Sequence, residues 1–247
     1  MTIQSSNIKS LGPLHFFDGE LGTFHGLLLE TTDLLMYQME QTLHALDYGD
    51  VDLALKVVSR DRKVDAQKMR IEAEIHGILA SNLSSTTDLR IVMTLSKMAD
   101  VLEKIGNEIV NLARQLQSIF DRRCGHYDAE LMAEIIRIGG MIKIMLDKMT
   151  LVLETRNSNQ AYKLVQFSWN CDTRLQQVLR CHLSSTLQNT VIIEHALDIL
   201  HILKTLERCT GFCRHIAEHQ ILMLDCIDMR CRPSITEACA INNIHII

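Results

Sequence analysis

Hydrophobic residues recur along most of the chain at the three- and four-residue spacing of an α-helix. The clearest case is residues 91–119, where the intervals between apolar positions alternate strictly between four and three. This heptad spacing places them on one face, as in a helix that packs lengthwise against its neighbours in a bundle. The residues of this seam are Ile91, Leu95, Met98, Leu102, Ile105, Ile109, Leu112, Leu116 and Ile119. We expect one long helix here.

Turn-forming residues divide the chain into six predicted helices. The only prolines are Pro13 and Pro233, so the long span between them lacks the strongest helix breaker. Gly49 and Asp50 end the first helix, and Asp50 is suited to cap the second. The predicted helices cover residues 18–47, 51–80, 88–120, 128–155, 160–183 and 191–228. The expected fold class is all-α.

The same seam returns in the second half of the chain. An offset of 104 residues moves the seam of the third predicted helix onto the sixth, at Ile199, Ile202, Leu206, Cys209, Cys213, Ile216, Gln220 and Met223. An internal repeat of this kind predicts two copies of one supersecondary unit. We therefore expect two tandem three-helix bundles, at residues 1–122 and 123–229, followed by a C-terminal tail at 230–247.

Composition and charge narrow the class of protein. The chain has 247 residues, of which 47% are hydrophobic and 22% charged, and its formal net charge is −5. Lysine and arginine are scattered rather than gathered on one stretch, which argues against a nucleic-acid partner. No apolar run approaches the ~20 residues of a membrane span, and the opening residues lack the apolar segment of a secretory signal. We expect a cytoplasmic protein.

The cysteines do not resemble a disulfide framework or a zinc ribbon. All eight lie at or beyond Cys124, and no CxxC pair occurs. Cys209 and Cys213, four residues apart and near His215, are candidates for a soft-metal site. Both, however, fall on the repeated seam. We expect them to be small buried core residues.

Four motifs, in order along the chain, resemble one known family. The segment LEKIGNEIVNLA at residues 102–113, preceded by DLR at 88–90, is similar to the family motif LERIGDxxxNIA. The second copy, LERCTGFCRHIA, covers residues 206–217. Residues 54–65 resemble the pattern AxxVxxxDxxVD on the family's second helix, and HFFDGEL at 15–21 resembles its HxxxFDxEL opening. Together they resemble the PhoU family.

The resemblance implies a regulator of phosphate signalling. A PhoU-like protein has two three-helix bundles and no enzymatic activity, and it restrains the phosphate-starvation response. Its expected partners are components of the phosphate ABC transporter, a phosphate-sensing histidine kinase and a second copy of itself. Contact with the membrane is expected only through such partners.

The resemblance also implies candidate metal sites, since some family members hold iron or zinc clusters on E(D)xxxD motifs. Residues four apart on a helix share a face, so two carboxylates can meet one cation. In the first half, Asp61 and Asp65 keep the motif whole, whereas Glu103 is followed by Asn107. Asp100, one turn earlier, is a possible substitute ligand. Iron, zinc, manganese and magnesium are the candidate cations.

In the second half the acidic pairs are broken. Asp172 is preceded by Ser168, and Glu207 is followed by Gly211. Exposed helix acids more often form ion pairs with neighbouring lysines, here Asp61 or Asp65 with Lys68, than bind metal. Two alternatives to the regulatory interpretation stay open: a helical metalloprotein that uses the first-half carboxylates, and a generic helical scaffold.

Overall fold

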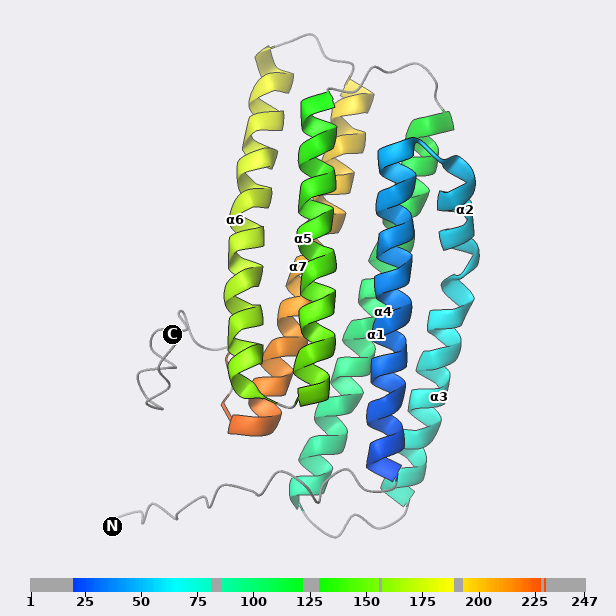
Figure 1. Ribbon diagram of the computed structural model, residues 1–247, viewed down its shortest axis with the longest axis vertical. Coiled ribbons are helices and arrows are strands. Elements are labelled where there is room, and N and C mark those ends of the chain that lie inside the picture. Colours follow the sequence, from blue (N-terminus) through cyan, green and yellow to red (C-terminus); the bar gives the residue numbers. More distant parts are fainter. Residues whose placement is uncertain are drawn as a thin grey trace, which may run out of the picture.

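Long antiparallel helices make up the described part of the chain. The computed structural model describes residues 20–80, 86–121, 129–155, 157–188, 193–227 and 229, and these residues contain no β-strand. The helices are α1 (Glu20–Tyr48), α2 (Val51–Ser59), α3 (Asp61–Ala80), α4 (Thr86–Asp121), α5 (Ala129–Thr155), α6 (Ser158–Gln188) and α7 (Ile193–Asp225). Figure 1 shows α1 to α4 as one bundle and α5 to α7 as a second beside it. The all-α prediction of two three-helix bundles is confirmed.

The prediction of a single second helix over residues 51–80 is wrong, because the helix is interrupted at Arg60. The Arg60 backbone N–H bonds to the Val57 carbonyl at 3.1 Å, a tight three-residue closure, and the Ser59 hydroxyl donates to the Lys56 carbonyl at 2.8 Å. The Arg60 guanidinium lies 4.8 Å from the ring centre of Tyr37 on α1. The helix is thus divided into α2 and α3, which still form one rod in Figure 1.

The turn signals predicted the start of α2 correctly and the end of α6 wrongly. Asp50 caps α2 as expected, since its carboxylate accepts a hydrogen bond from the Leu53 N–H at 3.0 Å. The predicted break after residue 183 is wrong, because α6 continues to Gln188. There the Thr186 hydroxyl donates to the His182 carbonyl at 2.8 Å, so its polar group is satisfied inside the helix.

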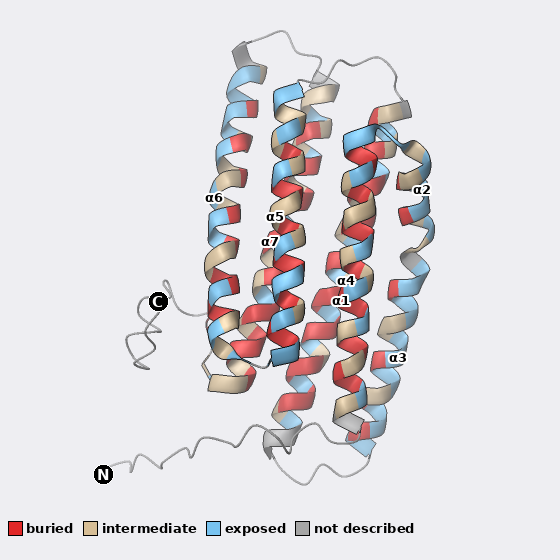
Figure 2. Ribbon diagram, viewed as in Figure 1, coloured by how far each residue is buried: buried red, intermediate tan, exposed pale blue. Residues whose placement is uncertain are grey.

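The predicted seams form the centre of the molecule. All nine seam residues of α4 and all eight of α7 are at most 6% exposed, and both belong to one continuous apolar core. In Figure 2 the buried positions of each helix face its neighbours, and the exposed positions face outward. Gly106 allows a close approach, because a Cβ there would lie 3.0 Å from Val64 and 3.1 Å from Leu35.

The repeat also extends to the first helix of each bundle. The nine buried residues of α5 are Ile135, Ile138, Gly139, Ile142, Met145, Leu146, Met149, Val152 and Leu153. Each lies 107 residues after a buried residue of α1. α1 and α5 also pack against each other, and the His25 ring donates across this contact to the Leu153 carbonyl at 2.9 Å.

One buried polar side chain in α1 has no counterpart in α5. Gln38 is fully buried, and among the described residues neither atom of its amide group has a hydrogen-bond partner. The residue 107 positions later is Met145, which is equally buried. An unsatisfied buried amide destabilises the folded state, so the second repeat has the better-suited residue.

We predict that Gln38→Met raises the free energy of unfolding by about 1–3 kcal/mol, because it removes an uncompensated buried amide and keeps the volume. Urea denaturation followed by circular dichroism measures this. Gln220→Met is the comparison variant: the Gln220 Nε2 donates to the Val152 carbonyl at 3.3 Å while only its Oε1 is unsatisfied, so its gain in stability should be smaller than that of Gln38→Met. A loss of stability in Gln38→Met would contradict the buried placement of this side chain.

The core cysteines behave as the seam predicts. Cys209 and Cys213 are fully buried. Burial raises the pKa of the Cys213 thiol to about 12 and raises the pKa of Cys209 well above its usual range. Both thiols are therefore protonated at neutral pH, whereas Cys181 is exposed on α6.

We expect iodoacetamide at neutral pH to leave Cys209 and Cys213 unmodified in the folded protein, because the reactive thiolate is absent and the sulfurs are inaccessible. Peptide mapping by mass spectrometry would report each cysteine separately. Cys181 should react quickly and acts as the internal control, and all three should react in urea. Rapid native labelling of Cys209 and Cys213 would refute the seam register.

Candidate functional site

The acidic residues of the first repeat gather around one lysine. Lys68 on α3 points to α4, where its Nζ lies 2.6 Å from Glu103 Oε2 and 3.9 Å from Asp100 Oδ1. A third carboxylate, Glu72, lies 3.8 Å away on α3 itself. The side chains of Lys68 and Glu103 are only about a quarter exposed, at 27% and 25%. The ammonium group thus occupies the centre of this cluster.

The hydrogen bond to Glu103 raises the pKa of Lys68 above its ordinary value, against the opposing effect of burial. Lys68 therefore stays charged at neutral pH and neutralises the cluster. The structure corrects our sequence interpretation here: Lys68 pairs with Glu72, Asp100 and Glu103, not with Asp65 three residues before it. The partners on α4 lie more than 30 residues away in sequence, beyond the reach of helical spacing.

The remaining first-half candidates do not join this cluster. Asp65 on α3 and Asn107 on α4 are exposed, and neither makes a hydrogen bond or ion pair within the described residues. Asp61 begins α3, but its side chain lies outside what the structure describes. Of the five predicted first-half ligands, the structure therefore brings together Asp100 and Glu103.

In the second repeat an arginine neutralises the corresponding acid. Arg214 on α7 forms an ion pair with Asp172 on α6, and its Nη1 lies 3.4 Å from the Ser168 hydroxyl. Gly211 lies one turn earlier on α7, beside this side chain: a Cβ there would be in ordinary contact with Arg214 Nη2, at 3.9 Å. The two motif positions that lost their carboxylates thus border an arginine.

Glu207, the last predicted ligand, is also engaged. Its Oε2 accepts from Lys204 Nζ at 2.6 Å and its Oε1 accepts from Gln176 Nε2 at 2.8 Å. Glu207 and Asp172 thus have separate cations. The described residues contain no group of three or more His, Cys, Asp or Glu side chains arranged to hold a metal ion.

These contacts make the predicted sites a poor fit for a divalent metal. Asp100, Glu103, Asp172 and Glu207 each already face a protein cation, which a metal would have to displace at the cost of leaving that cation without its partner. The geometry therefore does not favour metal binding at these four residues, whereas metal binding at Asp61, Asp65 and Asn107 stays a prediction.

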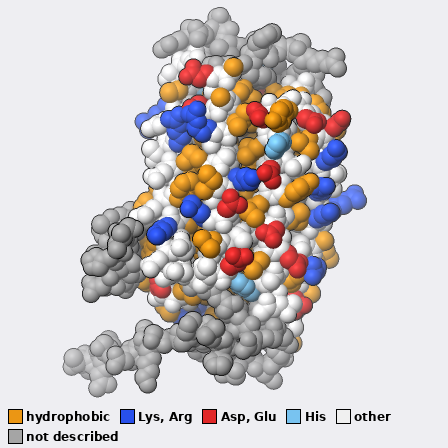
Figure 3. All heavy atoms as spheres, viewed as in Figure 1, with side chains coloured by type: hydrophobic (Ala, Val, Ile, Leu, Met, Phe, Trp, Pro, Cys, Tyr) orange, Lys and Arg blue, Asp and Glu red, His pale blue; other side chains and the backbone are white. Residues whose placement is uncertain are grey.

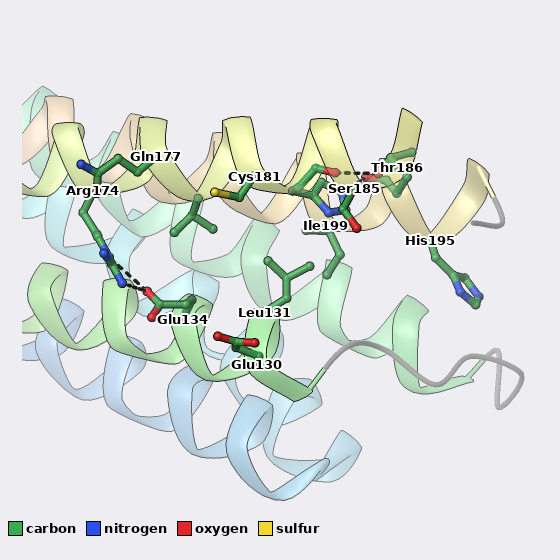
Figure 4. A pocket seen from close by; sticks show the side chains of 13 residues that line it. Glu130, Leu131, Glu134, Arg174, Gln177, Cys181, Ser185, Thr186, His195 and Ile199 are labelled. Carbon is green, nitrogen blue, oxygen red and sulfur yellow. Dashed lines mark hydrogen bonds and ion pairs between the residues drawn. The ribbon is translucent and has the colours of Figure 1, made fainter. Parts of the chain in front are cut away.

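A hollow among the described residues lies elsewhere, at one end of the second bundle. It has a volume of about 480 Å³ and lies between α5, α6 and α7. Figure 4 shows Arg174 reaching from α6 to Glu134 on α5, and the two are joined at 2.6 and 3.1 Å. The apolar part of the wall of this hollow is formed by Leu131, Val178 and Ile199.

The repeat explains why this end is hollow. The first bundle has large buried apolar residues at the equivalent positions, whereas the second has smaller or polar ones. The pairs are Phe24 and Leu131, Leu27 and Glu134, Ile71 and Val178, Ile75 and His182, Ile78 and Ser185, Ile91 and His195, and Val92 and Ala196. Sequence reasoning missed the pocket, although comparing the two repeats position by position would have indicated it.

Comparison with known proteins assigns the fold and the family. The model of the PhoU domain matches twice, at residues 29–116 and 135–219. The two matches fall in the two bundles, α1 to α4 and α5 to α7. The resemblance drawn from the helix motifs is confirmed. The exact bounds at residues 122 and 229 stay predictions.

Relatives of known sequence and solved structures are similar to this chain along most of its length. A phosphate-specific transport system accessory protein PhoU homolog of Pseudomonas aeruginosa is 26% identical over 215 residues, 87% of each protein. The PhoU of Escherichia coli K12 is 21% identical over 202 residues, 82% of each. The crystal structure of PhoU from P. aeruginosa gives a TM-score of 0.79 at 25% identity, covering 85% of this chain and 100% of that one. The phosphate transport system regulatory protein PhoU from Streptococcus pneumoniae gives 0.77 at 18%, covering 86% and 99%.

We predict that the purified protein retains little iron, zinc or manganese after dialysis, as measured by elemental analysis, because Lys68 and Arg214 already neutralise the acids. Lys68→Met should raise first-repeat metal affinity roughly fivefold, since a partly exposed ion pair contributes up to about 1 kcal/mol. Lys63→Met, on the same helix but outside the cluster, should change nothing. Several tightly bound metal ions per native chain would refute this account.

Proposed function

Because the chain belongs to the PhoU family, we propose that it is an accessory protein of the phosphate-specific transport system that restrains the phosphate-starvation response. The observation that carries the proposal is the PhoU match in both repeats, together with relatives named for that transport system. We propose that it works in the cytoplasm, as a homodimer, as an adaptor between the phosphate ABC transporter and a phosphate-sensing histidine kinase.

The proposed mode of action is docking rather than catalysis. A helical accessory protein shifts a signal when it binds one state of its partner more tightly than another. Among the described residues, twelve large apolar side chains are exposed on the helices, for example Met69 at 70% and Tyr48 at 76%. On the face seen in Figure 3, acidic, basic and apolar side chains are interspersed, a mixture suited to protein contacts. No helix in the described residues is long and apolar enough to cross a membrane.

The acidic stripe on α4, made of Asp100, Glu103 and Asn107, is our candidate contact surface. Asp100 and Asn107 are exposed, and the Lys68 pair fixes the orientation of Glu103. A fixed charge pair beside exposed polar groups offers a partner a defined pattern of donors and acceptors, which favours specificity. Asn107 is the safest position to change, since it makes no hydrogen bond within the described residues.

Deletion of the gene should leave phosphate-starvation genes switched on in phosphate-rich medium, measured with a reporter, because the restraint on kinase output is lost. Reintroducing the native gene should again repress the phosphate-starvation genes. Asn107→Arg should restore this repression poorly, because a large cation then stands on the contact surface. Asn170→Arg, at an equally exposed asparagine on α6, should restore it fully.

Two results would overturn the proposal. If the deletion strain keeps the starvation genes silent and no transporter or kinase component co-purifies with the tagged protein, the regulatory role is wrong. The generic scaffold would then replace it. If Asn107→Arg and Asn170→Arg complement equally, the role stands but the acidic stripe is not the contact surface.

A further inference from the structure

A second hollow lies between the two repeats, where α4 crosses α7. Its volume is about 260 Å³, and its walls are Lys97, Asp100, Val101 and Lys104 of α4 with His215 and His219 of α7. The helices run antiparallel, as Figure 1 shows. The hollow therefore belongs to neither bundle alone and is formed by the contact between them.

The charge in this hollow is unbalanced. Lys97 and Lys104 are exposed and make no ion pair within the described residues. The single carboxylate of the wall, Asp100, also faces Lys68 at 3.9 Å on its other side. Other lysines of the helices have close carboxylates, such as Lys143 with Glu40 at 2.6 Å. The hollow thus has a net positive charge even with neutral histidines.

The internal repeat supplies a natural control for this site. Because α4 and α7 are equivalent and antiparallel, every contact between them has a counterpart 104 residues away. The counterparts of the six wall residues are His201, Lys204, Thr205, Arg208, Asn111 and Gln115. There the space is bridged, since Gln115 Nε2 donates to Thr205 Oγ1 at 3.2 Å. Val101 takes the place of Thr205 in the hollow and offers no such acceptor.

The charges also differ between the two sites. Arg208 binds both oxygens of Glu108 at 2.8 Å, and the side chain of Glu108 is only 13% exposed. Lys104 is the counterpart of Arg208, but the counterpart of Glu108 is Phe212. One side of the α4–α7 contact is therefore neutralised and closed. The other side has Lys97 and Lys104, has phenylalanine at the counterpart of Glu108, and is open.

We propose that this hollow binds a small tetrahedral oxyanion of the phosphate or sulfate type. The anion supplies the negative charge that Glu108 supplies on the opposite side, with the ammonium groups of Lys97 and Lys104 as its charge partners. Lysine binds such anions as a mobile point charge. The rings of His215 and His219 border the same space. The hollow shares Asp100 with the acidic stripe, but anion binding does not depend on the proposed regulatory role.

Isothermal titration of the purified chain with inorganic phosphate at low ionic strength tests the proposal. We expect saturable binding of one anion per chain, with sulfate competing for the same site. Lys104→Gln should weaken binding about tenfold or more, the effect of one lost charge-assisted hydrogen bond. Phe212→Glu should weaken it too, because the new carboxylate would pair with Lys104 as Glu108 pairs with Arg208.

Lys63→Gln removes the same charge from an exposed position of α3 outside the hollow and should bind phosphate as the native chain does. Thermal unfolding of each variant verifies the fold. If Phe212→Glu proves to be unfolded, the test depends on Lys104→Gln, whose substitution is at an exposed position. Absence of saturable binding by either anion would overturn the site. So would equal affinity in Lys104→Gln and Lys63→Gln. Because binding is measured on the isolated chain, failure here leaves the genetic test of regulation unaffected.

Discussion

The packing of α4 against α7 is the constraint on which the rest of the molecule depends. Their two heptad seams are buried along nearly the whole length of both helices, and they join the cores of the two repeats into one. Truncating a single buried leucine or isoleucine of such a core costs about 2–5 kcal/mol, so the register of the two helices has little freedom. With the seams fixed inward, the polar positions between them must face the grooves beside neighbouring helices. That is where the acids, their cations and the hollow between the repeats are found.

The two repeats neutralise their acids by different routes. In the first, Lys68 reaches from α3 to α4; in the second, Arg214 reaches from α7 to α6. These pairs are partly exposed, and pairs of this kind contribute little to stability. Their main effect is to fix the side chains on the surface between helices. A chain can therefore keep the fold of its family while the chemistry of its helix grooves changes.

Much of the fold could be predicted from the sequence, because helical periodicity is a local signal. The seam of α4, its copy in α7 and the cap at Asp50 all follow from neighbours within a few residues. The break at Arg60 was missed because no proline or glycine marks it. The partners of Lys68 and Arg214 were missed because they lie on other helices, where only the packed structure brings them together. The pocket beside Glu134 was missed because helical periodicity within one repeat does not indicate it. Only a comparison of side-chain size between the two repeats does. Residues 15–19 of the opening motif and the tail from 230 lie outside the described residues, and metal content and dimerisation stay predictions.

Because the two repeats belong to one chain, the α4–α7 contact differs from the interface of a symmetric dimer of separate bundles. Dilution does not separate the two halves, since the covalent link keeps their effective concentration high. A mutation also changes only one side of the pseudo-symmetric contact, whereas in a dimer it would change both. The presence of glutamate at position 108 and phenylalanine at its counterpart, 212, is a difference that a homodimer of identical repeats could not have. One side of the interface can thus join the halves through the Arg208–Glu108 pair while the other side differs in charge and shape.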